Sequence, residues 1–315
     1  RICTDYKIKK TSWQGNEKEE MIMIRIRFDP EKLSEPQKAE WVRLVKRADR
    51  ATLEAIRAWE EWRVKGVAGT FTCSLLEEIW KSLKDWLLAE VFHNKCAYCE
   101  TREVRSPYHA EHYRPKGRVR FRVEGEKRLK KAVVIDEAGE EIEHPGYFWL
   151  SYNWLNLLPA CHACNSALGK NDQFPVKKMH IGVTRLMPEQ IKKLQRNLIK
   201  SPIRDGVYYL QPEDLNELEE PLLLNPYIDD PQEHLAFGEL GIVGPREGSD
   251  KGKQSISIYN LDAEELRIAR QKEQEAAYMQ YVTELGRGKG VTKAARIHGA
   301  KAAMTKYIAG DEPYS

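Results

Sequence analysis

Four of the six cysteines occur as two Cys-x-x-Cys pairs, the spacing at which two thiolates reach one tetrahedral zinc ion. The first pair is Cys96 and Cys99, in CAYC, and the second is Cys161 and Cys164, in CHAC. A thioredoxin-like redox site would need a single such pair at the start of a helix, and a reducing cytoplasm disfavours disulfides. The sequence therefore predicts one structural zinc held by all four thiolates, with a substantial insertion between the pairs.

The insertion contains side chains suited to phosphodiester hydrolysis. Glu111 and His112 lie in YHAEHYRPKG, and Asn165 directly follows Cys164. A neutral imidazole can take a proton from water at pH 7, while carboxylate and amide oxygens suit Mg²⁺ or Mn²⁺. An isolated Glu-His dipeptide is ordinarily a surface pair, and its position between the two Cys pairs favours the catalytic interpretation. Zinc would then be the scaffold, and a second divalent ion would assist catalysis.

The order of these motifs resembles the HNH, or ββα-metal, endonuclease family. The shared elements are a Cys-x-x-Cys, an acidic residue and His with Pro three residues beyond, and Asn-Leu ahead of a second Cys-x-x-Cys followed by Asn and Lys. The resemblance covers roughly residues 95–175 and implies two strands and a helix around one divalent ion. It implies that His112 is the general base, that Glu111 and Asn165 hold the ion, and that Asn156 pins the loop. Many members have Asp where this chain has Glu111. The extra methylene of Glu bears on where the ion would lie and on which divalent ion the site would prefer.

Basic residues accompany these motifs and are candidates for phosphate contacts. They are Arg114, Lys116, Arg118 and Lys170. Basic and apolar residues alternate over 118–123, as they would on a strand with one basic face, and a merely solvated strand is the alternative. The net charge of only +3 does not by itself indicate a nucleic-acid binder, because 48 acidic residues nearly balance 51 basic ones.

Hydrophobic periodicity indicates the elements around the motifs. Helices are expected over 34–63, 74–93, 187–200, 261–285 and 291–308. Strands are expected over 21–28 and 206–210, an acidic loop over 213–220, and a hairpin-like segment with turns at Gly125 and Gly139. The tryptophans of the first two helices have the spacing of core residues, and stacking platforms for bases are the alternative.

Together these features predict an α+β fold, mainly helical, with a central zinc-stapled ββα-metal module. We expect an N-terminal strand and helices over 1–94, the nuclease module with its zinc over 95–176, and a helical C-terminal region over 177–315. No run of about 18 apolar residues is present, and the N-terminus lacks an apolar signal core. The expected location is the cytoplasm, without membrane contact.

Two further segments resemble the HNH proteins of bacterial phage defence, especially the HNH subunit of Septu systems and related retron-associated nucleases. They are YFWLSYNWLNLLPACHACNSALGKNDQFP and LLLNPYIDDPQEHLAF. In those systems the nuclease works beside an ATPase, so the resemblance implies an ATPase partner, although this chain is longer than the usual subunit. In the second segment, Asn225, Asp229, Asp230 and His234 are expected to cap and turn the chain, and support of the site is the alternative.

The function that these motifs favour is metal-dependent cleavage of DNA by a defence effector. A nuclease acting on RNA or tRNA is an alternative, because nothing in the motif distinguishes the sugar. A non-catalytic zinc module that binds nucleic acid or a partner is a third possibility. The joint presence of Glu111, His112 and Asn165 speaks against it.

Overall fold

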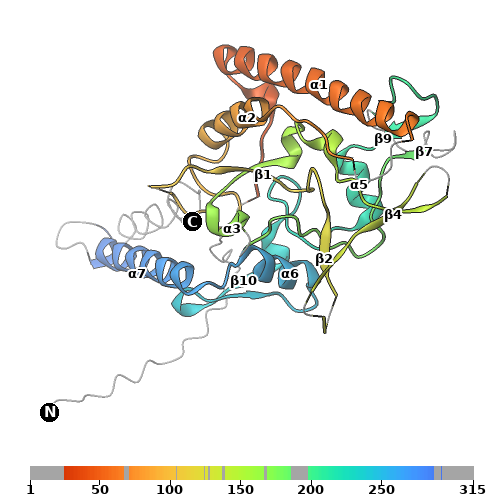
Figure 1. Ribbon diagram of the computed structural model, residues 1–315. Helices are drawn as coiled ribbons and strands as arrows, with labels where there is room; N and C mark the ends of the chain where they lie inside the picture. The colour runs from red at the N-terminus through yellow and green to blue at the C-terminus, as the bar shows by residue number, and fades with distance from the viewer. Residues whose placement is uncertain are drawn as a thin grey trace.

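The computed structural model describes residues 25–66, 71–103, 105–123, 125–126, 128–136, 139–166, 169–185, 198–286 and 292. Helices and strands are mixed, as an α+β fold requires (Figure 1). The helices are α1 (Glu35–Val64), α2 (Glu77–Glu90), α3 (His162–Asn165), α5 (Pro212–Glu219), α6 (Asp250–Tyr259) and α7 (Glu264–Gly286). The strands are β1 (His109–His112), β2 (Arg120–Arg122), β3 (Leu129–Lys131), β4 (Val133–Ile135), β5 (Glu141–Glu143), β6 (Leu157–Ala160), β7 (Thr184–Arg185), β8 (Ile199–Lys200), β9 (Val207–Tyr209), β10 (Leu235–Phe237) and β11 (Val243–Pro245).

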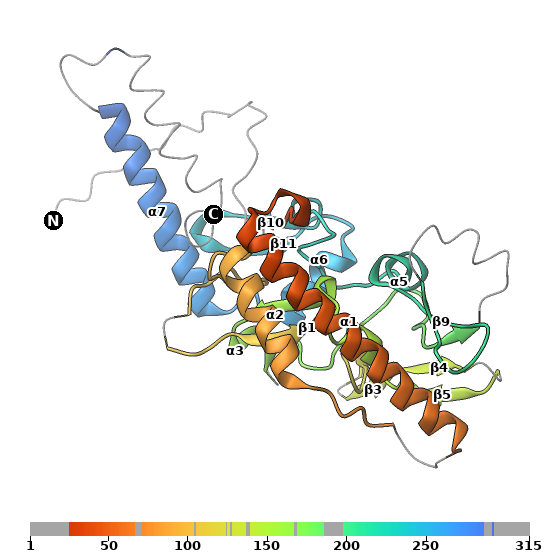
Figure 2. The same ribbon diagram turned by 90° about the horizontal axis from the view of Figure 1, so that it is seen from above.

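Helices α1 and α2 confirm the two helices expected near the N-terminus. Helix α1 is continuous, and at its start Gln37 Oε1 accepts a hydrogen bond from the Ser34 backbone N–H at 3.2 Å. The two helices pack side by side over one side of the molecule (Figures 1 and 2). Four of their five tryptophans are buried in the core, as their spacing predicted: Trp41, Trp59, Trp80 and Trp86. The fifth, Trp62, is partly buried against the same core.

The centre of the molecule is a strand–strand–helix unit made of β1, β6 and α3. Strands β1 and β6 are antiparallel, with Glu111 opposite Leu158 and His112 opposite Leu157. Every residue of β6 is buried, because α2 packs against this strand. Helix α3 begins directly after Cys161, so its short turn follows the sheet without a long connection.

The segment between β1 and β6 folds into two hairpins, β2–β3 and β4–β5. Gly125 and Gly139 lie in their turns with φ of +81° and +86°, the left-handed region that glycine adopts without a steric cost. The expected turns at both glycines are confirmed. In Figure 1 the β2–β3 hairpin points downward and the β4–β5 hairpin points to the right.

The structure differs from the sequence-based expectations in three segments. The described part of the N-terminal strand, residues 25–28, forms no strand and is tied by a backbone bond from Ile26 to the Pro226 carbonyl at 2.7 Å. The expected acidic loop is helix α5, because Pro212 and the acidic first turn favour a helix N-terminus. Helix α6 was not expected, and it begins where Ser249 Oγ accepts from the Gly252 backbone N–H at 3.0 Å.

The remaining expectations divide between confirmed elements and positions outside the described residues. Strand β9 and helix α7 confirm the predictions over 206–210 and 261–285. The helix expected over 187–200 falls mostly outside the described residues, and its last two residues form β8, which pairs with β9. The helix expected over 291–308 lies outside them, apart from residue 292, which is not helical.

One hydrophobic core joins the three regions expected from the sequence. Side chains of α1, α2, β6, β9 and α6 all belong to it, while α7 extends away from the body (Figure 2). Within the described part of the chain, none of the helices has the length and apolar character that a membrane span requires.

Candidate active site and metal centre

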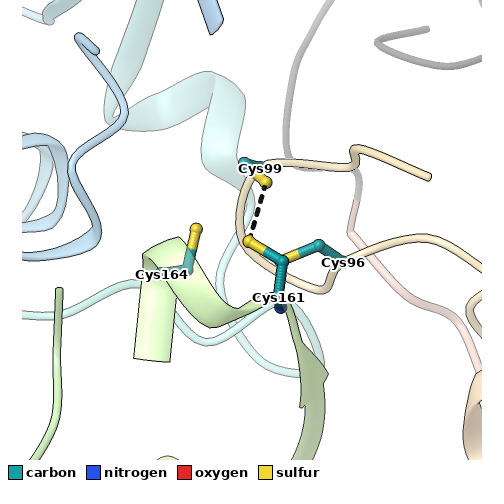
Figure 3. Close-up of side chains that lie close together, drawn as sticks. All are labelled: Cys96, Cys99, Cys161 and Cys164. Atoms are coloured by element: carbon teal, nitrogen blue, oxygen red, sulfur yellow. Dashed lines mark hydrogen bonds between the residues drawn. The ribbon is translucent and has the colours of Figure 1, made fainter. Parts of the chain in front are cut away.

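The four cysteines of the two Cys-x-x-Cys pairs converge, although the pairs are far apart in the chain. Their sulfur atoms all lie within 4.8 Å of one another, and all four side chains are buried. Figure 3 shows Cys96 and Cys99 on one loop facing Cys161 and Cys164, which lie at the start of α3 and within it. The Sγ atoms of Cys99 and Cys161 are 3.7 Å apart. Tetrahedral zinc with bonds of 2.3 Å places its sulfur ligands about 3.8 Å apart, so this group of thiols suits a zinc ion.

Backbone hydrogen bonds hold the two cysteine loops against each other. The Ala97 N–H donates to the Pro159 carbonyl at 2.8 Å, which joins the first loop to β6. The Cys161 N–H donates to Cys96 Sγ at 3.3 Å, a common way of stabilising negative charge on a ligand sulfur. Hydrogen bonds from the neighbouring thiols, that of Cys164 first, hold the pKa of Cys161 far below its usual range. The same contacts with Cys161 raise the pKa of Cys99 and of Cys164. Cys161 therefore ionises first, and a cation bound among the sulfur atoms would favour ionisation of the others.

Glu111, His112 and Asn165 line a single cleft of about 560 Å³ beside this cluster. Strand β1 carries the first two residues, and Asn165 is the last residue of α3. The pairing of β1 with β6, and the direct passage from β6 into α3, bring them together. Lys116 and Arg118 line the same cleft. The residues that the sequence selected for hydrolysis thus share one space.

His112 is buried and oriented by its neighbours. Its Nε2 lies 3.0 Å from the Ser151 carbonyl oxygen, which can only accept a hydrogen bond, so Nε2 carries the proton and Nδ1 is the unprotonated nitrogen. Trp80 of α2 packs edge-on against the imidazole, with ring centroids 5.3 Å apart. Burial lowers the pKa of His112 to about 3, and the charge of Lys116 adds to this effect. The ring is therefore neutral at pH 7, the form that can accept a proton.

Glu111 forms a buried ion pair with Lys170. Lys170 Nζ lies 2.6 Å from Glu111 Oε1 and donates to the His112 carbonyl at 2.9 Å. Burial raises the pKa of Glu111, and the ammonium group partly opposes this. Because the Lys170 side chain is fully buried, the expectation that it contacts nucleic acid is wrong. Its position beneath the site requires Gly169, where a Cβ would lie 2.3 Å from the Cys164 carbonyl oxygen.

Asn156 joins the loop that follows β1 to the turn before β6. Its Oδ1 accepts from the Arg114 N–H at 2.7 Å, and its Nδ2 donates to the carbonyls of Arg114 at 3.1 Å and Leu150 at 3.2 Å. The side chain is buried away from water, so these hydrogen bonds satisfy its polar atoms within the protein. The contacts are those of a residue that pins the loop.

Arg114 does not face solvent, so the expected phosphate contact is wrong for this residue as well. Its guanidinium group is buried, pairs with Glu219 of α5 and donates to Asn216 Oδ1 at 2.8 Å. It lies over the rings of Tyr147 and Phe174, 5.1 and 4.8 Å from their centroids. The expectation failed because its partner is distant in sequence and the segment carrying that partner was interpreted as a loop.

The other basic candidates remain near the cleft. Lys116 Nζ lies 4.7 Å from the centroid of the Trp80 ring, and burial lowers its pKa while Glu111 opposes the effect. Arg118 and Arg120 both pair with Asp172, each at 2.6 Å. The Arg118 side chain is still 55% exposed, so it can reach a phosphate at the cleft.

Four residues of the site were missed or assigned another role from the sequence. Trp80 was assigned to the core, and nothing in the helical pattern signals its contact with His112. Ser151 acts through its carbonyl oxygen, a group that every residue possesses, so sequence carries no signal for it. Asp172 and Glu219 become important only because folding brings arginines to them.

The segment after Leu224 has the turn role that we favoured. Asp229 Oδ2 accepts from the Asn225 N–H at 2.7 Å, Asp230 caps a short 3-10 helix, and His234 Nδ1 lies 2.9 Å from Ser249 Oγ. None of these side chains lines the cleft that contains His112.

Comparison with known proteins gives one informative relative. The chain is 36% identical over 187 residues to the Septu protein PtuB of Bacillus mycoides strain KBAB4. The matched region is 59% of this chain and 49% of that protein, so the chain spans about half the length of the relative. No family model matches the chain, and no solved structure matches it significantly.

Proposed function

We propose that this protein is a metal-dependent HNH endonuclease that cleaves DNA as an effector of a Septu-type bacterial anti-phage defence system. The observation that carries the proposal is the cleft in which Glu111, His112 and Asn165 meet beside four clustered thiols. The similarity to a protein named as a Septu component supports the role in defence. The strand–strand–helix order of β1, β6 and α3 supports the ββα interpretation.

The donor groups suit a hard divalent cation. The carboxylate of Glu111 and the amide oxygen of Asn165 are the ligand types that Mg²⁺ and Mn²⁺ prefer, and both residues line the cleft. An ion held by these residues would neutralise charge on the phosphate. His112, neutral and with Nδ1 unprotonated, would take the proton from the attacking water, while Lys116 and Arg118 would bind the phosphodiester.

The test is cleavage by the purified full chain in Mg²⁺ or Mn²⁺. Wild type should nick plasmid DNA and leave 5′-phosphate ends, and His112→Ala should abolish nicking without loss of zinc or of the folded state. His109→Ala is the matched control, because His109 lies on the same strand but does not line the cleft. Equal cleavage by His112→Ala and wild type would refute the role of His112.

A parallel digestion of plasmid DNA and tRNA identifies the substrate. Preference for tRNA would replace the DNA-cleaving function with the RNA-cleaving one. Binding without cleavage of either nucleic acid by wild type would favour a non-catalytic zinc module.

We also propose that an ATPase of the same defence system is the partner. The similarity to a Septu protein supports this assignment. Co-purification of the chain with the products of neighbouring genes tests it, and recovery of the chain without an ATPase would contradict it.

A further inference from the structure

Lys170 is a fully buried ammonium group beside the carboxylate that is to hold the divalent ion. Its side chain has no exposed surface, and that of Glu111 is only 5% exposed. The Nζ atom reaches Glu111 Oε1 at 2.6 Å and the His112 carbonyl at 2.9 Å. Charges so far from solvent are weakly screened, so this pair interacts more strongly than an exposed pair would.

Lys170 lies in this position because its backbone is held against α3. The Lys170 N–H donates to the Cys164 carbonyl at 2.9 Å, and Gly169 permits the close approach of the chain to α3. The same short region therefore carries a zinc-ligand cysteine, Asn165 and the ammonium group. Lys170 cannot reach a substrate, because it lies beneath the cleft lining and not within it.

A divalent ion at Glu111 would have to share a carboxylate whose charge a fixed cation already balances. The ion would also be repelled by that cation across a poorly screened environment. A bound phosphate adds negative charge to the cleft and offsets this repulsion. Lys170 is therefore placed so that tight binding of the ion would depend on a bound phosphate group.

We propose that Lys170 is a positioning residue that lowers the affinity of Glu111 for the divalent ion, so that the ion binds tightly only when a phosphodiester occupies the cleft. The inference rests on the proposed function, because it takes Glu111 as a ligand of the ion. It adds a regulatory property of the site that the positions of the ligands alone do not imply.

The test is Mn²⁺ binding to the full chain, measured by electron paramagnetic resonance without nucleic acid. Lys170→Met and Lys170→Gln should both bind Mn²⁺ at least about tenfold more tightly than wild type, because a nearby positive charge is removed. The Gln variant retains a hydrogen-bond donor toward Glu111, and zinc content with thermal melting identifies variants that keep the fold. Adding a DNA oligonucleotide to the His112→Ala chain should tighten Mn²⁺ binding, and this gain should shrink in the His112→Ala/Lys170→Gln double variant.

Glu111→Gln separates this inference from the proposed function. If wild type binds Mn²⁺, Glu111→Gln loses it, and folded Lys170 variants bind no more tightly than wild type, only the role of Lys170 is overturned. If wild type binds no Mn²⁺ with or without the oligonucleotide, both the inference and the metal-dependent nuclease are overturned. Tighter binding by the Lys170 variants that disappears on adding Glu111→Gln supports both.

Discussion

Replacement of Arg114 by Met should strongly destabilise the protein, although the sequence suggested a phosphate contact for this residue. The guanidinium group is completely buried and pairs with Glu219, which is itself without exposed surface. Met retains an unbranched apolar side chain but leaves the Glu219 carboxylate without its counter-charge. Removal of one member of a buried ion pair costs about 3–5 kcal/mol of unfolding free energy.

Glu219 keeps other donors in the variant, and these limit the loss. Tyr147 Oη donates to Glu219 Oε1 at 2.7 Å, and the Ile181 N–H donates to the same oxygen at 2.6 Å. Neither donor carries a full positive charge, so the carboxylate remains uncompensated. We therefore expect a loss near the lower end of the range, about 3 kcal/mol, which is a large part of the stability of an ordinary domain.

Urea unfolding followed by tryptophan fluorescence and circular dichroism measures this effect. Arg118→Met is the matched control, since it removes an arginine whose side chain is 55% exposed and should cost only about 0–1 kcal/mol. Adding Glu219→Gln to Arg114→Met should recover part of the loss, because no buried charge then remains. A loss below about 1 kcal/mol for Arg114→Met, with weaker binding of DNA, would refute the structural role and restore the phosphate contact.

Three further predictions concern the metal centre, the loop and the pH dependence. Cys161→Ser should lose bound zinc and lower the melting temperature, whereas Cys73→Ser, outside the cluster, should leave both unchanged; metal analysis and calorimetry test this. Asn156→Ala should cost about 1–3 kcal/mol for each buried group left without a partner, and should slow cleavage more than it weakens DNA binding, which urea unfolding and kinetics separate. Burial lowers the pKa of His144 to about 3, below the 6.5 of an exposed His, so unfolding takes up a proton between these values. The contribution of His144 to stability should be complete above pH 6.5 and fall as the pH drops toward 3. His144→Gln should flatten this dependence in urea unfolding at several pH values, and an unchanged slope would contradict it.

Local sequence was sufficient to predict the elements whose signals, such as capping residues and apolar spacing, lie in or next to the element itself. Helix α1 has a capping residue, Ser34, directly before its first residue and a long apolar stripe along its length, so both signals lie in the local sequence. The hairpin turns could be predicted because Gly125 and Gly139 have backbone conformations that glycine favours. The cysteine pairs signalled a common ion by their spacing, and the structure brings their sulfur atoms together.

Only the tertiary structure decided which charged groups are buried and which side chains they contact. Arg114 and Lys170 look in sequence like solvent-exposed cations, yet each lies against a carboxylate from a distant segment. Their environment depends on how α5 and the turn after α3 pack around β1, and long-range packing leaves no local pattern. Sequence alone determined which side chains were candidates for the proposed hydrolysis, and packing determined which of them face the cleft. The physical reason is that the spacing of residues along the sequence shows which side chains share a face of one helix or strand. Burial and charge pairing depend instead on contacts between elements.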